Sequence, residues 1–115
     1  PGGNRSQFGN EDIENMKISA THVQGIFGVT LDDLCDKWGF PYPNYMKIDV
    51  DGIEISILSG AHAVLRHPAL KSVIIELGTT AEQEKAIDLM RSAGLEVKHR
   101  STKNWGETCL IFQRI

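Results

Sequence analysis

The alternation of hydrophobic and polar residues predicts an α/β protein from about residue 29 onward. Helix-like periods cover 30–38, 54–66 and 79–93, and strand-like runs cover 46–50, 72–77, 95–99 and 109–115. The loop between the last two strands is too short for a crossover helix, so these strands must be antiparallel. The helical connections before them favour right-handed parallel crossovers. We therefore expect a mostly parallel sheet with a closing antiparallel hairpin.

Local signals mark the ends of these predicted helices. Thr30 is suited to the N-cap of the first helix, and Gly39 to the C′ position just after its end. Thr79 and Glu82 have the spacing of a capping box at the start of the third helix. Gly60, inside the second helix, costs up to about 1 kcal/mol relative to alanine, which predicts that it allows close packing against the sheet.

The N-terminal part of the chain carries weaker signals. Residues 1–17 show no apolar period and are predicted to be a loop or a disordered lead-in. Residues 18–29 mix apolar and β-branched residues with glycines, which favours one strand or two short ones. The run 72–77 is almost continuously apolar and β-branched, as expected for a central strand covered on both faces. Residues 18–115 are predicted to form a single domain.

Composition and charge exclude several classes of protein. Hydrophobic residues make up 41% of the chain and charged residues 23%, as in ordinary folded domains. The net charge of -3 gives no reason to expect nucleic acid as a partner. No apolar run is long enough for a membrane span, and no signal peptide is visible. Cys35 and Cys109 are predicted to be buried free thiols, which favours a reducing compartment and a cytoplasmic protein.

A cluster of acids follows the predicted strand 46–50. Asp49 lies at the end of the strand, and Asp51 and Glu54 follow it around one glycine. Because an unpaired carboxylate is costly to bury, we expect these side chains where the strand runs out into a crevice, which is where α/β sheets bind ligands. Glu76, at the end of the next strand, is expected either to line the same crevice or to make a structural hydrogen bond.

Two other kinds of site share part of this pattern. Asp49 and Asp51 are spaced like the first ligands of a calcium loop, but the positions that follow do not supply the required ligand and glycine. We therefore expect no metal. Asp-x-Asp-Gly after an apolar strand also resembles the nucleophile loop of haloacid dehalogenase-like phosphatases. That loop normally continues with threonine, where this chain has Ile53, and no acid pair for magnesium follows.

Three sequence blocks carry a more specific resemblance. The central block is Lys-Ile-Asp-Val-Asp-Gly-Ile-Glu at 47–54, followed by Leu-Ser-Gly-Ala at 58–61. The weaker blocks are Val-Thr-Leu-Asp-Asp-Leu at 29–34 and Val-Ile-Ile-Glu at 73–76. In this order they resemble the FkbM family of S-adenosylmethionine-dependent methyltransferases. The family's usual central form is Lys-Ile-Asp-Val-Glu-Gly-x-Glu, so Asp51 replaces a glutamate here.

The resemblance implies a fold, and it implies that part of that fold is missing. It implies the C-terminal portion of a Rossmann-like class I methyltransferase sheet, since such sheets finish with an antiparallel hairpin. The class binds S-adenosylmethionine through a first strand, a glycine-rich turn and an acid after the second strand, and this sequence shows none of them. Residues 18–115 are thus predicted to be a partial methyltransferase domain. We expect the 115-residue chain alone neither to bind S-adenosylmethionine nor to be active.

The resemblance also implies roles for the acids in a complete protein. The reaction would be methylation of a hydroxyl group on a sugar or related small molecule, with S-adenosylmethionine as the cofactor. Asp49 is the candidate general base or cofactor contact. Asp51, Glu54 and Glu76 are the candidate substrate-binding residues. The structural alternative is that an acid between a strand and a helix only stabilises the start of that helix.

A non-catalytic interpretation stays open beside the enzymatic one. In this interpretation the chain is a binding or assembly module, or an inert fragment. An exposed sheet edge, at the place where the missing strands would pair, would favour self-association. The sequence does not identify the acceptor.

Overall fold

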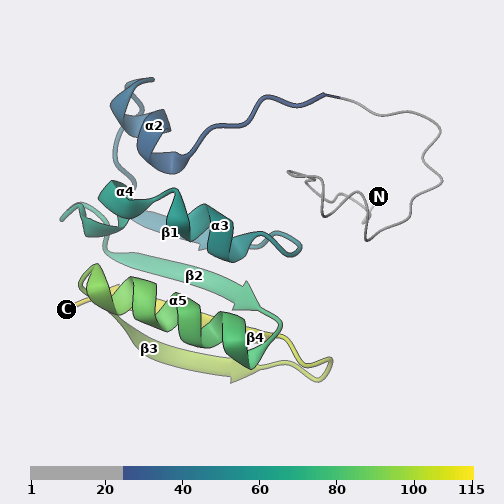
Figure 1. The fold of residues 1–115 in the computed structure, drawn as a ribbon. Coiled ribbons are helices and arrows are strands. Elements are labelled where there is room, and N and C mark those ends of the chain that lie inside the picture. Colours follow the sequence, from purple (N-terminus) through teal and green to yellow (C-terminus); the bar gives the residue numbers. More distant parts are fainter. Residues whose placement is uncertain (1–24) are drawn as a thin grey trace.

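The computed structural model describes residues 25–115 (Figure 1). These residues form, in chain order, α2 (Leu31–Asp36), β1 (Tyr45–Ile48), α3 (Glu54–Ser59), α4 (His62–Arg66), β2 (Ser72–Leu77), α5 (Thr80–Ser92), β3 (Leu95–Thr102) and β4 (Thr108–Arg114). The predicted order of elements is confirmed, except that the second predicted helix is divided into α3 and α4.

The predictions for the N-terminal part can be compared with the structure only from residue 25 onward. The lead-in predicted for 1–17 and most of the strand predicted within 18–29 lie outside the described residues. Residues 25–30 contain no strand, so the strand prediction is wrong for that part.

The four strands form one mixed sheet in the order β1-β2-β4-β3. β1 and β2 are parallel, whereas β4 is antiparallel to both of its neighbours, β2 and β3. The prediction of a mostly parallel sheet is therefore wrong for the described residues. The reason is that the last strand turns back between β2 and β3, so a single reversed strand creates two antiparallel pairs. The closing antiparallel hairpin of β3 and β4 is confirmed.

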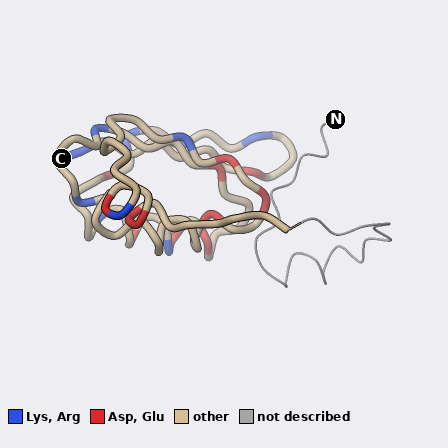
Figure 2. Tube along the Cα trace, turned by 90° about the horizontal axis from the view of Figure 1, so that it is seen from above, with Lys and Arg blue, Asp and Glu red and all other residues tan. Residues whose placement is uncertain are grey.

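Helices cover one face of this sheet. Figure 1 shows α3, α4 and α5 on the same side of the strands, and Figure 2 shows the helical layer and the sheet separated in the view from above. Along β2, Val73, Ile75 and Leu77 are buried in the core, and Ile74 and Glu76 on the opposite face are half-buried. The expectation that β2 is covered on both faces is wrong within the described residues. We call the uncovered side the open face.

The second predicted helix is interrupted at Gly60 and Ala61, between α3 and α4. A Cβ atom added to Gly60 would lie 3.0 Å from Cγ2 of Thr30, closer than side chains normally approach. The close packing predicted for Gly60 therefore exists, but it is against the N-cap of α2 and not against the sheet. The Gly60 carbonyl also accepts a 3.1 Å hydrogen bond from the backbone N–H of Asp32.

The predicted helix starts are confirmed, and one predicted helix end is displaced. The Thr30 hydroxyl accepts a 3.1 Å hydrogen bond from the backbone N–H three residues on. Thr79 and Glu82 form a complete capping box at the start of α5. Gly39 has a positive φ of 73°, but the C-cap of α2 is Lys37, so Gly39 lies one position beyond the predicted C′.

The cysteines are both free, with Cys35 buried and Cys109 half-buried. Within residues 25–115, no helix combines the length and the hydrophobicity that crossing a bilayer requires.

Candidate functional site

Two of the predicted site residues lie side by side where β1 and β2 end. Asp49 directly follows β1, and Glu76 is the penultimate residue of β2. Parallel pairing sets Ile48 opposite Ile75, so the next residue of each strand projects from the open face beside the other. The two carboxyl groups lie close enough for each to act on the pKa of the other. We call Asp49 and Glu76 the carboxyl pair.

A cationic residue, Lys103, reaches the carboxyl pair from the loop that joins β3 to β4. Its ammonium group forms an ion pair with the Glu76 carboxylate and lies 5.3 Å from the centre of the Trp105 ring. The Lys103 N–H donates a 2.7 Å hydrogen bond to the Glu107 carbonyl, which closes the base of the loop. No sequence signal pointed to this residue, because the loop meets the carboxyl pair only through the pairing of β4 with β2.

The two members of the carboxyl pair differ in their electrostatic surroundings. Desolvation and the negative charge of Glu76 raise the pKa of Asp49. The hydrogen bond from Lys103 lowers the pKa of Glu76, although desolvation acts in the opposite direction. Lys47, on the same face of β1, acts to lower the pKa of both carboxyl groups. Asp49 is therefore the member of the pair that holds a proton more readily.

Glu54 is separated from the carboxyl pair by its burial. It is the first residue of α3, and only 5% of it is exposed. Burial raises the pKa of its carboxyl group, while hydrogen bonds from its own backbone N–H and that of Gly52 act in the opposite direction. The charges that raise the pKa further are those of Glu82, in the first turn of α5, and Asp51. Glu54 is thus placed to organise the start of α3.

Asp51 occupies a third kind of position. It is exposed in the turn between β1 and α3, beside Gly52, whose φ of 90° lies in the left-handed region that favours glycine. The acids predicted to gather at one crevice are therefore divided. Asp49 joins Glu76 on the open face, Asp51 lies in the exposed turn, and Glu54 is buried.

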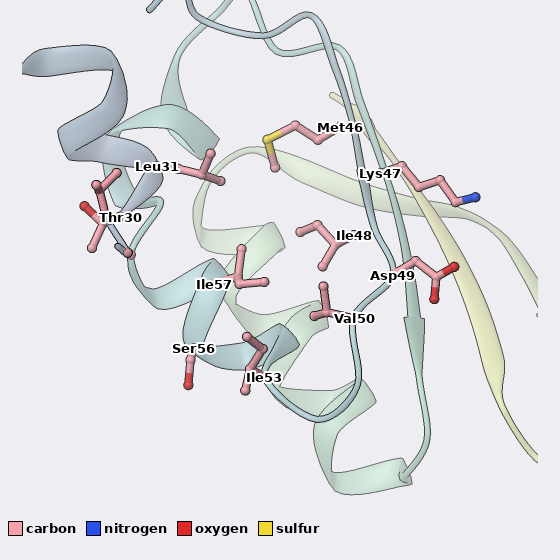
Figure 3. Close-up of a pocket in the computed structure, with 13 residues that line it drawn as sticks. Thr30, Leu31, Met46, Lys47, Ile48, Asp49, Val50, Ile53, Ser56 and Ile57 are labelled. Carbon is pink, nitrogen blue, oxygen red and sulfur yellow. The ribbon is translucent and has the colours of Figure 1, made fainter. Parts of the chain in front are cut away.

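A cavity of about 960 Å³ lies on the side of β1 opposite to the carboxyl pair, between α3 and the segment that enters α2. Figure 3 shows that Lys47 and Asp49 point away from it. The apolar side chains that point toward it are Leu31, Met46, Ile48, Val50 and Ile57 (Figure 3). This hollow is thus lined mainly by apolar side chains, and the side chain of the predicted base points away from it.

The Asp32 side chain connects two of the sequence blocks that carry the resemblance. Its carboxylate oxygens accept hydrogen bonds of 2.9 Å from the backbone N–H groups of Ala63 and Val64, in the first turn of α4. Together with the contacts of Gly60, these bonds fasten the Thr-Leu-Asp-Asp block to the segment that follows Leu-Ser-Gly-Ala. Sequence reasoning missed this role, although Asp32 lies in one block and its partners directly follow another.

The starts of α4 and α5 are poorly suited to hold a nucleoside. The first N–H groups of α5 bond with Thr79 and Glu82, and Asp32 bonds with those of α4. Each of the two strand-to-helix turns contains a single glycine, Gly52 or Gly78. The nucleoside half of S-adenosylmethionine therefore does not fit these residues. Nor is any group of three or more His, Cys, Asp or Glu within them placed to hold a metal ion.

Comparison with known proteins assigns the chain to a family, which the geometry of the site alone does not do. The sequence model described as Methyltransferase FkbM domain matches residues 4–100, which is most of the chain. The chain belongs to the FkbM methyltransferase family. The resemblance carried by the three sequence blocks is thus confirmed. The matched range of the FkbM domain contains the carboxyl pair and Asp32 but ends before Lys103. No curated protein and no solved structure matches this FkbM chain.

Proposed function

We propose that the chain forms the acceptor side of an S-adenosylmethionine-dependent O-methyltransferase, which modifies a hydroxyl group of a sugar or related small molecule. Membership of the FkbM family supports the reaction class. The observation that carries the assignment of the site is the carboxyl pair, a basic carboxylate at a strand end with a second carboxylate beside it. We further propose that the sheet is the C-terminal portion of a Rossmann-like class I methyltransferase sheet, because it ends in an antiparallel hairpin.

The proposed role of Asp49 is to accept the proton of the acceptor hydroxyl. A hydroxyl group is a weak nucleophile until it loses that proton, and a positioned carboxylate is a suitable general base. The raised pKa of Asp49 makes its carboxylate more basic than an ordinary aspartate. After the transfer, the protonated Asp49 donates a hydrogen bond to Glu76, which stays ionised beside Lys103. When bound, S-adenosylmethionine would supply an electrophilic methyl group on a positively charged sulfur.

The other two predicted acids receive different parts in this proposal. Asp51 is exposed in the turn that follows the base, so we propose that it binds the acceptor directly. Glu54 is buried and hydrogen-bonds to the N–H of Gly52 in the same turn. We propose that Glu54 contributes to acceptor binding by fixing the turn that carries Asp51.

We propose that the nucleoside half of S-adenosylmethionine is held by residues outside 25–115. This follows from the starts of α4 and α5, whose N–H groups already bond to side chains, and from the lack of a glycine-rich turn among these residues. The proposal keeps the interpretation of the chain as a partial methyltransferase domain. The cytoplasmic location expected from the free thiols stays a prediction.

The test of the proposed function is methyl transfer by a longer protein that contains this chain. Asp49→Asn keeps the shape of the side chain and its hydrogen bonding but removes the base, so turnover should fall by about 100-fold or more, the usual contribution of a general base. Asp88→Asn, the same exchange on the exposed side of α5, should leave turnover unchanged. If the turnover of Asp49→Asn is close to that of the unmodified protein, Asp49 is not the general base.

A second candidate function, self-association, is favoured by one observation. Among the described strands β1 is at the edge of the sheet, and its first residue, Tyr45, is 74% exposed. A free edge presents backbone groups to which another chain can pair. Sedimentation equilibrium of the chain tests this candidate: a concentration-dependent dimer that Lys47→Pro abolishes supports it, and a monomer at all concentrations rejects it.

A further inference from the structure

The loop between β3 and β4 is built to keep one cation in a fixed place. Besides the bond between Lys103 N–H and the Glu107 carbonyl, the Gly106 N–H donates to the Lys103 carbonyl at 2.9 Å. The Trp105 indole N–H donates to the Glu107 carboxylate at 2.8 Å. Gly106 has a φ of 92°, which allows the tight return of the chain. These bonds fix the backbone of the loop at Lys103, whose side chain reaches Glu76 near the end of β2.

The ion pair of Lys103 involves Glu76 and not the other member of the carboxyl pair, Asp49. The Lys103 ammonium group bonds to the Glu76 carboxylate, and the parallel pairing of β1 and β2 places Glu76 beside Asp49. Only 14% of the Glu76 side chain is exposed, so this ion pair is partly shielded from water. The cation thus forms its bond with one carboxyl group, whereas its charge is the weakest of the influences on the pKa of the other, Asp49.

We propose that Lys103 is a positioning residue of the carboxyl pair: it holds Glu76 in the ionised form, so that Asp49 is the carboxyl group that carries the proton shared between them. Its part in catalysis rests on the proposed function, whereas its effect on the proton does not. Lys103 lies beyond residues 4–100, to which the family model matches.

The charged groups around the carboxyl pair come from two elements. β1 contributes Lys47, and the β3–β4 loop contributes Lys103, on which Glu107 of the same loop acts in turn. Helices do not contribute, because the described helices that pack on the sheet cover its other face. Lys47 acts on both carboxyl groups in the same direction, so it does not decide between them. The charge of Lys103 also lowers the pKa of Asp49, but its hydrogen bond goes to Glu76, so Lys103 favours ionisation of Glu76 over that of Asp49.

The protonation states agree with this arrangement. The hydrogen bond to Glu76 raises the pKa of Lys103, so its ammonium group remains charged while the carboxyl groups titrate. The same bond lowers the pKa of Glu76, and the ionised Glu76 raises that of Asp49. In the proposed reaction, the acceptor O–H bond breaks, an O–H bond forms on Asp49, and that hydroxyl donates to the Glu76 carboxylate. No further proton donor is needed.

The experiment is a pH titration of the 115-residue chain by carbon-13 NMR, with the side-chain carboxyl resonances assigned through Asp49→Asn and Glu76→Gln. Lys103→Met removes the cation and keeps most of the side chain. Lys103→Arg keeps a cation. Lys98→Met is the matched control, because Lys98 forms an ion pair of 2.8 Å with Glu96, away from the carboxyl pair. Lys103→Gln gives a second neutral side chain in case the methionine variant does not fold.

The carboxyl pair should titrate in two steps. In the unmodified chain, the titration step at higher pH should appear mainly at the Asp49 resonance, and the step at lower pH mainly at the Glu76 resonance. In Lys103→Met or Lys103→Gln, the Glu76 step should move to higher pH, and both resonances should follow both steps. Lys103→Arg and Lys98→Met should keep the original pattern. A neutral variant with an unchanged Glu76 titration would overturn the proposal, as would a Lys98→Met variant that shifts it equally.

This titration separates the two proposals. It requires neither cofactor nor acceptor, so it gives a result even if the protein does not methylate hydroxyl groups. Conversely, an unchanged titration would leave Asp49 available as the base and would reject only the role of Lys103.

Discussion

Removal of the Asp32 carboxylate should destabilise the chain more than any neighbouring acid on α2. Asp32→Ala removes two hydrogen bonds of 2.9 Å to the first turn of α4. α4 has five residues, and its own N-cap, Ala61, supplies no side-chain bond, so the N–H groups of Ala63 and Val64 would lose the carboxylate that binds them. A helix this short depends on such tertiary support.

The magnitude follows from the exposure of these groups. A hydrogen bond to a charged group contributes about 1.5–3 kcal/mol, and loss of an N-cap side chain costs about 0.5–2 kcal/mol. Ala63 is exposed, so its N–H regains water in the variant, whereas Val64 is buried. We therefore expect Asp32→Ala to lower the free energy of unfolding by about 2 kcal/mol, which corresponds to a midpoint about 5–10 °C lower for a domain of this size.

The assay is urea unfolding of the unmodified chain, Asp32→Ala, Asp32→Asn and Asp36→Ala, followed by circular dichroism. Asp32→Asn keeps one acceptor oxygen and should fall between the alanine variant and the unmodified chain. Asp36→Ala, at the exposed last residue of α2, should change stability by less than about 0.5 kcal/mol. Equal effects of Asp32→Ala and Asp36→Ala would refute the interpretation of the two sequence blocks as one structural joint.

Two further predictions concern Glu54 and the cofactor. The pKa of Glu54 is raised in the folded chain, so stability is lost as the pH rises from about 4.5 through the folded pKa. In thermal melts, Glu54→Gln should therefore lose less stability over that interval than the unmodified chain. Glu84→Gln, a control at an exposed position on α5, should lose as much as the unmodified chain. By calorimetry, the 115-residue chain should show no saturable binding of S-adenosylmethionine; tight binding would place a nucleoside site within it.

The features that the sequence predicted well depend on neighbouring residues. Thr30 and the Thr79–Glu82 capping box act within one helical turn, and the bounds of β2 follow from its β-branched run. The pairing of Asp49 with Glu76 was also within reach, because the two residues lie at the ends of consecutive strands that pair in parallel. Membership of the FkbM family could be inferred from the three blocks alone.

The features that the sequence did not predict depend on contacts between distant segments. The bonds of Asp32 to α4 span 31 and 32 residues, and the ion pair of Lys103 with Glu76 spans 27. The second of these needs the position of β4 beside β2, which the local pattern does not contain. The burial of Glu54 follows from the sharp turn at Gly52, which directs the chain away from the open face.

The most direct test of the central claim, that Asp49 is the base of a methyl-transfer site, is the pH dependence of kcat/KM for methyl transfer in a longer protein that contains this chain. A base acts only when ionised, so the rate should rise with pH through one ionisation above the ordinary range of an aspartate, in line with the raised pKa of Asp49. Asp49→Asn should abolish that ionisation together with most of the rate. A profile that is flat, or that persists unchanged in Asp49→Asn, would contradict the account.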